Sequence, residues 1–387
     1  MSLSESLDAS TIAVSRIAGE YADAVDHANR IPSETLAALR QEGLLSLLVP
    51  RSLGGQEQTL SQVAAVCSAL GQACGSSAMI HAMHHIQVAC VVAHGLHSDW
   101  HRELLQRLCR EQLLFGSVTS EVGTGGDIHS SICCVEAEGS KVSLAKDATT
   151  VSYGTSADAL LITARRSRDA VASDQVMLVA TRDDYALEQT SSWDALGMRG
   201  TCSEGFRVRA TADPAQVLPA PFADIASQTM LPVSHLLWCS VWLGIATDAI
   251  TRARAYLRQQ ARSGRGALSP GGHRLAKGVG LLQLMQSRLS SALRDYDAAF
   301  ADGPKPLPFG FTADMNSLKT SISELCLEVV QHALMICGIN GYKNGSKYSL
   351  GRHLRDISSA PIMINNDRML ESTGNLYLMH RPPLGIL

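Results

Sequence analysis

Three histidines of this chain have the residue type and spacing that metal chemistry requires. His81, His84 and His85 recur at one-turn spacing, which places their imidazole rings on one face of a helix. A metal site would also need an H-E-x-x-H pattern or a nearby carboxylate, and the segment offers neither. We therefore expect ordinary helix-face histidines and no metal centre.

A glycine-rich run, Gly-Thr-Gly-Gly at 123–126, is a second candidate for binding chemistry. Exposed backbone N–H groups in such a loop can bind an anion. The run lies among short β-favouring segments, whereas the dinucleotide fingerprint of a nicotinamide enzyme joins a strand to a helix. By itself the run predicts a turn, and it argues against a classical nicotinamide dehydrogenase.

The bulk composition narrows the partners that these residues would serve. The chain has 387 residues and a formal net charge of -3, without a block of Lys and Arg. Nucleic-acid binding is therefore not expected. The ten cysteines form no C-x-x-C pair, which favours free thiols in a reducing cytoplasm. The uncharged run 225–247 contains Ser, Gln and His, so we expect a buried helix and no membrane span.

The type of secondary structure that the sequence predicts changes twice along the chain. Residues 11 to about 110 read as helices, and Ser33 is the predicted N-cap of one of them. Residues 113 to about 221 read as a small antiparallel β-region. From residue 226 long helical patterns return. The expected strands are 132–135, 141–144, 159–163 and 175–180, and the expected long helices are 60–71, 78–95, 236–260, 274–300 and 316–337.

Four segments carry a family resemblance. The first runs from Ile31-Pro32 to Gly54-Gly55, and the second is FGSVTSEVGTGGD at 115–127. The third is LGMRGTCS at 196–203, and the fourth combines CGINGY at 337–342 with LRD at 354–356. In this order and spacing they resemble the acyl-CoA dehydrogenase superfamily of flavoproteins. The resemblance implies an α+β multidomain fold. Its expected parts are an N-terminal α-helical domain (1–112), a small antiparallel β-barrel or sandwich (113–222) and a C-terminal four-helix bundle (223–387).

The resemblance also implies FAD as the cofactor. Ser120 stands where the family usually has threonine, Gly126 where it has serine, and Thr150 where it has tryptophan. Ser152 falls at a position that contacts flavin in relatives, although a strand serine bonded to backbone is the plainer alternative. Arg262 or Arg265 would pair with a phosphate. The implied cofactor-binding residues are Ser117, Thr119, Ser120, Gly125, Gly126, Ser152, Arg262, Gly338, Ile339 and Asn366.

The catalytic base of the family is missing. Many relatives have a glutamate eight residues beyond the Asp of the R-D motif, and here that position is Ile364. A second location used by relatives falls near Ser234, which is not acidic either. The substitutes are His235, whose pKa suits proton transfer, and the carboxylates Asp367 and Glu371. A structural histidine and solvated carboxylates are the alternatives. Arg355-Asp356 also has a structural alternative as a packed ion pair.

The leading functional prediction is an FAD-dependent oxidoreductase that desaturates the α,β bond of an acyl thioester on CoA or a carrier protein. An electron-transfer flavoprotein would then be a partner. The first alternative is a flavin-dependent monooxygenase of the same fold, supplied with reduced flavin by a reductase, and the missing carboxylate favours it. The second is a non-catalytic partner subunit. Relatives imply a cytoplasmic homotetramer, and the uncharged helix 236–246 suits burial between subunits.

Overall fold

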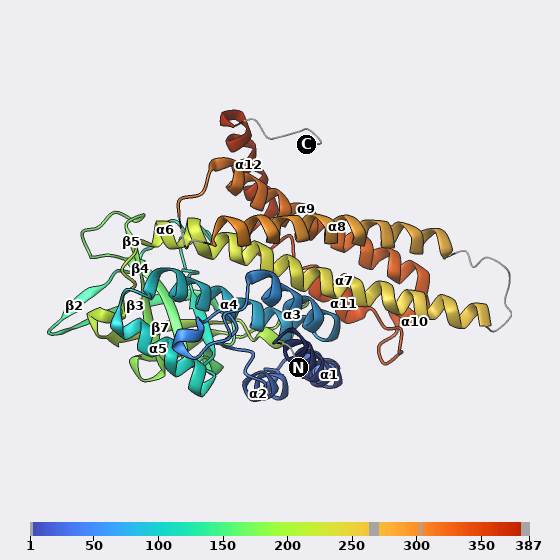
Figure 1. Cartoon of the computed structure of the whole chain (residues 1–387), viewed down its shortest axis with the longest axis horizontal. Coiled ribbons are helices and arrows are strands. Elements are labelled where there is room, and N and C mark those ends of the chain that lie inside the picture. Colours follow the sequence, from blue (N-terminus) through green and yellow to red (C-terminus); the bar gives the residue numbers. More distant parts are fainter. Residues whose placement is uncertain (1–2, 263–270, 302, 304, 381–387) are drawn as a thin grey trace.

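The computed structural model describes residues 3–262, 271–301, 303 and 305–380. The N-terminal part is helical, as expected. Its helices lie beside the sheets and below the long C-terminal helices in Figure 1. They are α1 (Leu3–Ala28), α2 (Ser33–Gln41), α3 (Leu60–Ala73), α4 (Gly75–Gly95) and α5 (Asp99–Glu111), with a short 3₁₀ turn, η1 (Arg51–Leu53).

The start of α3 has a regular side-chain cap, whereas the start of α2 differs from the prediction. Thr59 precedes α3 and forms a capping box with Gln62, so that each side chain bonds the backbone of the other. The prediction of Ser33 as an N-cap is wrong. Pro32 occupies that position, and Ser33 is the first helical residue. Proline has no side-chain acceptor, so the first N–H groups of α2 receive no side-chain cap.

The middle part contains two sheets. One has the order β1-β4-β5 and the other β2-β3-β7-β6. Residues of β4 and β5 are buried almost throughout, whereas β3 alternates between buried and exposed positions. The second sheet therefore has one solvent face. The strands are β1 (Phe115–Val118), β2 (Glu136–Glu138), β3 (Lys141–Val151), β4 (Ala159–Arg165), β5 (Gln175–Thr181), β6 (Tyr185–Ser191) and β7 (Glu204–Ala212).

Two strand predictions need correction. The region is not purely antiparallel, because β1 pairs with β4 in parallel. The chain between them passes through the whole β2–β3 hairpin, which gives the long connection that a parallel pair needs. The expected strand 132–135 is also wrong. Only an isolated bridge joins Cys134 to Arg165 there.

Long helices return in the C-terminal part, where α7, α8 and α9 run side by side along the longest axis (Figure 1). The final helix, α12, packs on α9 and projects from the body. The helical, sheet and helical order predicted from the sequence is confirmed, while the domain limits at 112 and 222 stay predictions. The C-terminal helices are α6 (Phe222–Ile225), α7 (Leu231–Arg262), α8 (Gly272–Ala299), α9 (Phe309–Cys337), α10 (Ile339–Tyr342), α11 (Gly351–Ile357) and α12 (Asn366–Met379).

The core helix of the molecule is α7, which packs against α3, α4, α8 and α9. Glycines permit the closest contact: a Cβ on Gly71 would lie 2.6 Å from Val241 O, and one on Gly244 would lie 2.2 Å from Ser68 O. The helices α3 and α7 therefore meet backbone to backbone. The segment 236–246, expected to pack between subunits, is already covered within the chain, and Leu236 and Trp242 are fully buried.

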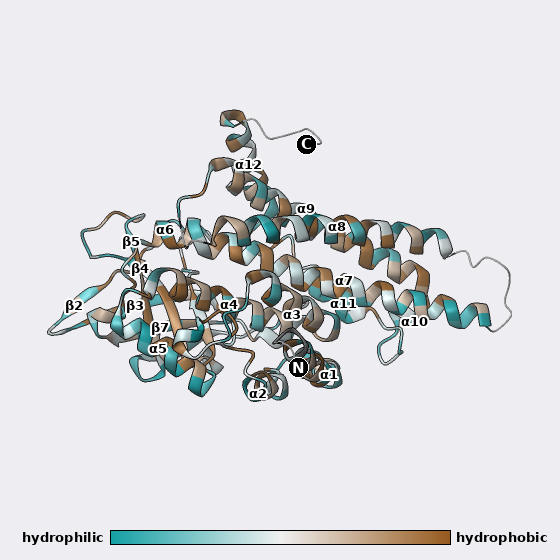
Figure 2. Cartoon of the chain, in the orientation of Figure 1, coloured by the Kyte–Doolittle hydropathy of each residue, from teal (hydrophilic) through white to brown (hydrophobic). Residues whose placement is uncertain are grey.

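Helices α6 and α7 are joined by the π-helical turn Ala226–Met230 into one continuous helical segment, Phe222–Arg262. This segment is the one helix of the described chain that is long and apolar enough to cross a membrane. Within its most apolar window, 83% of the residues are buried inside the protein. Its far end, near Arg262, is hydrophilic and teal in Figure 2. This burial is what a core helix of a folded protein requires, in agreement with the sequence-based expectation.

Candidate functional site

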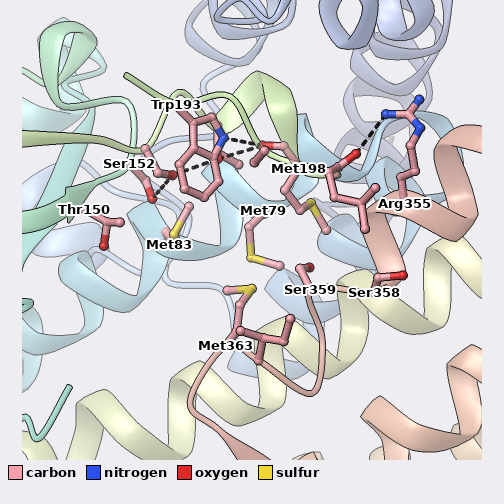
Figure 3. Close-up of a pocket in the computed structure, with 16 residues that line it drawn as sticks. Met79, Met83, Thr150, Ser152, Trp193, Met198, Arg355, Ser358, Ser359 and Met363 are labelled. Carbon is pink, nitrogen blue, oxygen red and sulfur yellow. Dashed lines mark hydrogen bonds between the residues drawn. The ribbon is translucent and has the colours of Figure 1, made fainter. Parts of the chain in front are cut away.

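A cavity of about 440 Å³ lies where the three parts of the chain meet. Helix α4, the end of β3, the turn that precedes β7 and the segment after α11 all contribute to its wall (Figure 3). The lining residues are Met79, Met83, Thr150, Ser152, Trp193, Ala195, Leu196, Gly197, Met198, Thr201, Ser203, Arg355, Ser358, Ser359, Ile362 and Met363.

Most of this wall is apolar and adaptable. Met79, Met83, Met198 and Met363 come from three different regions of the chain, and the indole of Trp193 adds a broad flat surface (Figure 3). Thioether side chains are flexible and polarisable, and they pack well against aromatic rings. The cavity therefore suits a planar or otherwise apolar molecule.

One side of the cavity carries a chain of hydroxyl groups. The hydroxyls of Ser152 and Ser203 lie 2.8 Å apart, and those of Thr201 and Ser203 also lie 2.8 Å apart. Thr201 Oγ1 donates to Met198 O at 2.8 Å, and the indole N–H of Trp193 donates to the same oxygen at 3.2 Å. The chain thus links β3 to the turn before β7 and fixes the hydroxyls at the cavity wall.

The cation at the cavity edge is neutralised from outside. Arg355 donates from Nη1 to Asp26 Oδ1 at 2.8 Å and to Leu196 O at 3.1 Å, and its Nη2 also bonds Asp26. This pairing raises the pKa of Arg355 above its usual value. Among the described residues, Arg355 is the one titratable side chain in the cavity lining. The cavity consequently offers no unpaired charge to a ligand.

Arg355 and Asp356 do not pair with each other, so the packed ion pair weighed from the sequence is wrong. The carboxylate of Asp356 points to the turn before β7, where its Oδ1 accepts the Met198 N–H at 2.7 Å. Burial raises the pKa of Asp356 to about 6, against the opposing effects of Arg352 and the Met198 N–H. Both residues of the motif therefore hold the cavity wall in place.

Backbone strain is concentrated around this cavity. Seven residues other than glycine have positive φ in the described chain, and four of them border the cavity or adjoin its lining. These four are Tyr153 (44°), Met198 (51°), Cys202 (41°) and Ile364 (54°). Such conformations cost free energy and cluster at functional sites. The strain supports the cavity as the working site of the molecule.

The predicted flavin-binding strand and loop lie close to the cavity. Ser117 is on β1 and Thr119 follows it, and neither hydroxyl has a protein partner in the described part of the chain. Ser120 Oγ donates to Thr150 O at 2.8 Å and accepts the Thr150 N–H at 3.1 Å. Ser120 therefore joins this segment to β3, at the cavity.

The glycine loop that follows is exposed but attached at two points. Arg368 of α12 donates from Nη2 to Gly125 O at 2.8 Å, and Gly126 lies beside the same guanidinium. At the two ends of the loop, Glu121 accepts the N–H groups of Ile132 (3.1 Å) and Cys133 (2.6 Å).

The attachment of Glu121 rests on a buried cation. Lys146 of β3 is fully buried, with its Nζ 3.5 Å from the Glu121 carboxylate. It also donates to Thr163 O at 2.7 Å. This pair fixes the start and the end of the loop 121–133 on the sheet.

The remaining predicted cofactor residues lie elsewhere. Arg262 borders a separate hollow at the far end of α7, together with Arg258 and Lys347. None of these three cations has a carboxylate partner in the described chain, which suits an anion. Arg265 lies outside the described residues. Gly338 and Ile339 are exposed at the end of α9.

Asn366 is buried against α9, where its Oδ1 accepts from Lys319 Nζ at 2.8 Å. Of the ten predicted cofactor residues, Ser152 is the one that lines the cavity. The assignment of the others to a cofactor stays a prediction.

The three candidate bases are not brought to the cavity. His235 is buried in the helical core, and burial lowers its pKa to about 3, with the nearby Lys319 acting in the same direction. Asp367 and Glu371 are exposed on α12. None of the three belongs to the cavity lining. Their catalytic roles stay untested predictions that this geometry does not favour.

The histidines at one-turn spacing on α4 are structural. His81 and His85 bond Leu44 O through Nε2, at 3.2 and 3.0 Å, and His84 bonds Leu45 O at 2.7 Å. His84 Nδ1 also accepts the Phe115 N–H at 2.9 Å. Burial lowers the pKa of His81 to about 3 and that of His84 to about 4, so the rings are neutral. Through these bonds the histidines attach α4 to the loop after α2 and to β1.

Sequence reasoning missed most of the cavity wall. Trp193, Met79, Met83 and Met363 belong to no motif. Met79 and Met83 lie on helix α4, where apolar residues predict core before they predict a binding surface. The hydroxyl of Ser203 was visible in the turn motif at 196–203, although no role was assigned to it. A signal for Trp193 was its position, an isolated aromatic residue among polar ones just before that turn.

Comparisons with known proteins agree with this architecture. Residues 9–112 match the family "Acyl-CoA dehydrogenase, N-terminal domain" and residues 224–364 match "Acyl-CoA dehydrogenase, C-terminal domain". The chain is 25% identical to the probable FMNH2-dependent monooxygenase SfnC of Pseudomonas putida over 259 residues, which are 65% of this chain. This match spans 63% of the length of SfnC.

Two solved structures share the fold. FMN-bound TdsC, a dibenzothiophene monooxygenase from Paenibacillus sp. A11-2, aligns with a TM-score of 0.84, 20% identity and coverage of 98% of each chain. Butyryl-CoA dehydrogenase from Megasphaera elsdenii aligns with a TM-score of 0.81 and 16% identity, covering 98% of this chain and 99% of its own.

Proposed function

The chain belongs to the acyl-CoA dehydrogenase superfamily and is a flavin-dependent oxidoreductase, and on this premise we propose that it is a monooxygenase that uses reduced flavin and dioxygen. This proposal reverses the order of the two enzymatic functions predicted from the sequence. Desaturation of an acyl thioester was the leading prediction, and oxygen insertion was the alternative.

The cavity without a carboxylate carries the proposal. Desaturation requires a base that removes a weakly acidic α-proton. Ile364 occupies the position of the usual glutamate, and the described lining contains no Asp, Glu or His. Arg355, its one titratable group, is already paired with Asp26. Oxygen insertion needs no such base, because the electrons come from the reduced cofactor.

The residues around the cavity fit a flavin. Ser117 and Thr119 present hydroxyls that have no partner within the described part of the protein, and Thr150 and Ser152 present two more at the cavity wall. These donors suit the polar edge of an isoalloxazine ring. Arg258, Arg262 and Lys347, which have no carboxylate partner among the described residues, suit a phosphate, in this or a neighbouring copy. We propose FMN in place of the expected FAD. Similarity to an FMNH2-dependent enzyme and to FMN-bound TdsC supports this choice.

When bound, the reduced flavin supplies the electron pair that lets one atom of dioxygen enter the substrate while the other leaves as water. The chain's own residues orient and protect this reaction. Ser152, Ser203 and Thr201 hold hydroxyl protons at fixed positions beside the reacting space. The methionines and Trp193 exclude bulk water, which strengthens each remaining polar interaction.

The proposed partners follow from this chemistry. A separate flavin reductase would supply the reduced cofactor, and no electron-transfer flavoprotein is needed. A homotetramer is proposed from family membership. Exposed apolar side chains on α12 support it, since Leu378 is 86% and Met379 72% exposed.

The test supplies reduced FMN from NADH and a flavin reductase in air, with dibenzothiophene as the probe substrate. We expect a product heavier by one oxygen atom, which carries ¹⁸O when the gas is ¹⁸O₂. The competing assay adds butyryl-CoA to the protein with oxidised FAD under anaerobic conditions. Bleaching of the flavin there would overturn the proposal in favour of desaturation. Failure of both assays with a wider substrate panel would favour the non-catalytic reading.

A further inference from the structure

A buried lysine lies behind the cavity wall. Lys319 of α9 is fully buried, and no carboxylate pairs with it in the described chain. Its Nζ donates to Ile364 O at 2.5 Å and to Asn366 Oδ1 at 2.8 Å. The centre of the Trp242 ring lies 5.9 Å from the same nitrogen. A buried ammonium group without a carboxylate is costly, so its hydrogen bonds should serve a purpose.

Both acceptors belong to the segment that follows the cavity lining. Ile364 has φ of 54°, a conformation that a β-branched side chain disfavours strongly. It comes directly after Ile362 and Met363, which line the cavity. A strained backbone persists only where the surroundings impose it. Lys319 is the group that holds the strained carbonyl.

The other end of the contact is anchored as well. Asn366 Nδ2 donates to Ser323 Oγ at 2.9 Å and to Glu324 Oε1 at 3.3 Å, and its own N–H bonds Pro361 O at 3.0 Å. The segment 361–366 is therefore closed on itself by the bond from the Asn366 N–H to Pro361 O, and it is attached to α9 at Ile364 and Asn366. These bonds restrain the backbone that carries Ile362 and Met363 at the cavity wall.

We propose that Lys319 is a positioning residue that imposes the strained conformation of Ile364 and thereby keeps Met363 and Ile362 in the cavity wall. Lys319 does not touch the cavity and acts through the backbone of the 361–366 segment. The effect of Lys319 on substrate binding rests on the proposed function of the cavity as the substrate site. The effect of Lys319 on the backbone conformation of Ile364 is independent of that function.

The charge of the lysine is not what this role requires. Burial lowers the pKa of Lys319 to about 8, against the opposing effects of Cys239, Cys326 and Glu324, and His235 is the other titratable group facing it. A neutral amine still has two N–H donors for its two acceptors. The contact therefore persists on both sides of this pKa.

The test measures hydrogen exchange of the holoprotein, incubated with FMN, by mass spectrometry of peptides covering 358–366. In Lys319→Met, which keeps the bulk and removes the donors, we expect exchange of this segment to rise at least tenfold while α8 is unchanged. Lys319→Arg, which keeps donors, should recover part of the protection. The control Lys277→Met replaces an exposed lysine on α8 and should change nothing in the segment.

Ile364→Gly tests the same contact if Lys319→Met does not fold. Glycine adopts a φ of 54° without strain, so Ile364→Gly should keep the segment protected within twofold of the wild type while Lys319 is present. Adding Ile364→Gly to Lys319→Met should restore part of the lost protection. Loss of protection in Ile364→Gly alone would show that side-chain packing of Ile364, and not Lys319, sets the conformation.

Unchanged exchange in a folded Lys319→Met would overturn the proposal outright. These readouts need no substrate and no turnover, so they stay informative if the monooxygenase proposal fails. If that proposal holds, Lys319→Met should raise KM for dibenzothiophene at least tenfold with a smaller change in kcat, since the variant alters the binding surface and leaves the hydroxyl chain intact.

Discussion

Gly197 and Arg355 meet backbone to backbone, and next to them Met198 bonds Asp356, a residue 158 positions further along the chain. A Cβ on Gly197 would lie 2.0 Å from Arg355 O and 2.5 Å from the Asp356 nitrogen. The obstructing atoms are main chain, so they cannot rotate away. The turn at 196–203 and helix α11 are therefore fitted to each other at a position that accepts only glycine.

We expect Gly197→Ala to separate these two elements. Because overpacking against backbone cannot relax locally, the free energy of unfolding should fall by about 3 kcal/mol. Urea denaturation measures this loss. Gly280→Ala on α8 is the matched control, since nothing lies within 4 Å of its Cβ and alanine stabilises a helix by about 0.5–1 kcal/mol. Equal stability of the two variants would contradict the contact.

Asp356 should make stability depend on pH. Its pKa is about 6 in the folded chain against 3.8 for the free group, so the folded state binds more protons between these values. The contribution is fully present below about pH 4 and is lost as the pH rises through 6, by on the order of 2–3 kcal/mol.

Asp356→Asn should abolish this dependence, because the amide oxygen still accepts the Met198 N–H and carries no charge to bury. Urea unfolding at pH 4, 5, 6 and 7 gives the difference between variant and wild type at each pH. We expect the variant to gain relative stability as the pH rises. A difference that stays constant across the range would exclude the raised pKa.

The buried pair of Lys146 and Glu121 should be costly to break. Lys146→Met leaves the Glu121 carboxylate buried without its cation, and the free energy of unfolding should fall by about 3–5 kcal/mol. Arg168→Met removes one member of an exposed pair with Glu136 and should leave stability near that of the wild type. Retention of FMN on a desalting column should fall in the first variant only, because the loop 121–133 loosens.

The hydroxyl chain should matter for turnover more than for folding. Ser203→Ala removes the bonds to Ser152 and Thr201, so the Ser152 hydroxyl loses its partner and Thr201 keeps only its bond to Met198 O. We expect oxygenated product to form about tenfold more slowly, which corresponds to ~1.4 kcal/mol. Ser227→Ala removes an exposed hydroxyl that bonds within its own helical turn and serves as the control. Identical rates in both variants would remove Ser203 from the reaction.

Much of the fold could be predicted because its signals are local. The long helices show periodic apolar residues, and turn residues bound the strands of the middle sheets. The parallel pairing of β1 with β4 could not be predicted, since its partners are 44 residues apart and short strands carry no mark of direction. Ser33 shows a related limit, because a favourable cap residue one position too late becomes the first residue of the helix.

The site was harder to predict than the fold. The motif at 115–127 predicted a loop near the cofactor, which stays a prediction, and Ser152, predicted to contact flavin, lies in the cavity lining. His235 had both a catalytic and a structural interpretation in the sequence, and only three-dimensional packing shows that the helical core encloses it. Asp356 looked like a partner for its neighbour, yet its acceptor role depends on a turn far away in sequence. Contacts of this kind depend on tertiary structure and leave no local pattern.

The bond from Met198 to Asp356 also sets an order of events during synthesis. The cavity wall begins at Met79 and ends at Met363, so a nascent chain holds most of the wall long before it holds the part that closes it. Until residue 356 has left the ribosome, the turn at 196–203 has no acceptor for its Met198 N–H. A chain stopped short of α11 would carry both sheets and the long helices, but it would have a cavity open to water on one side.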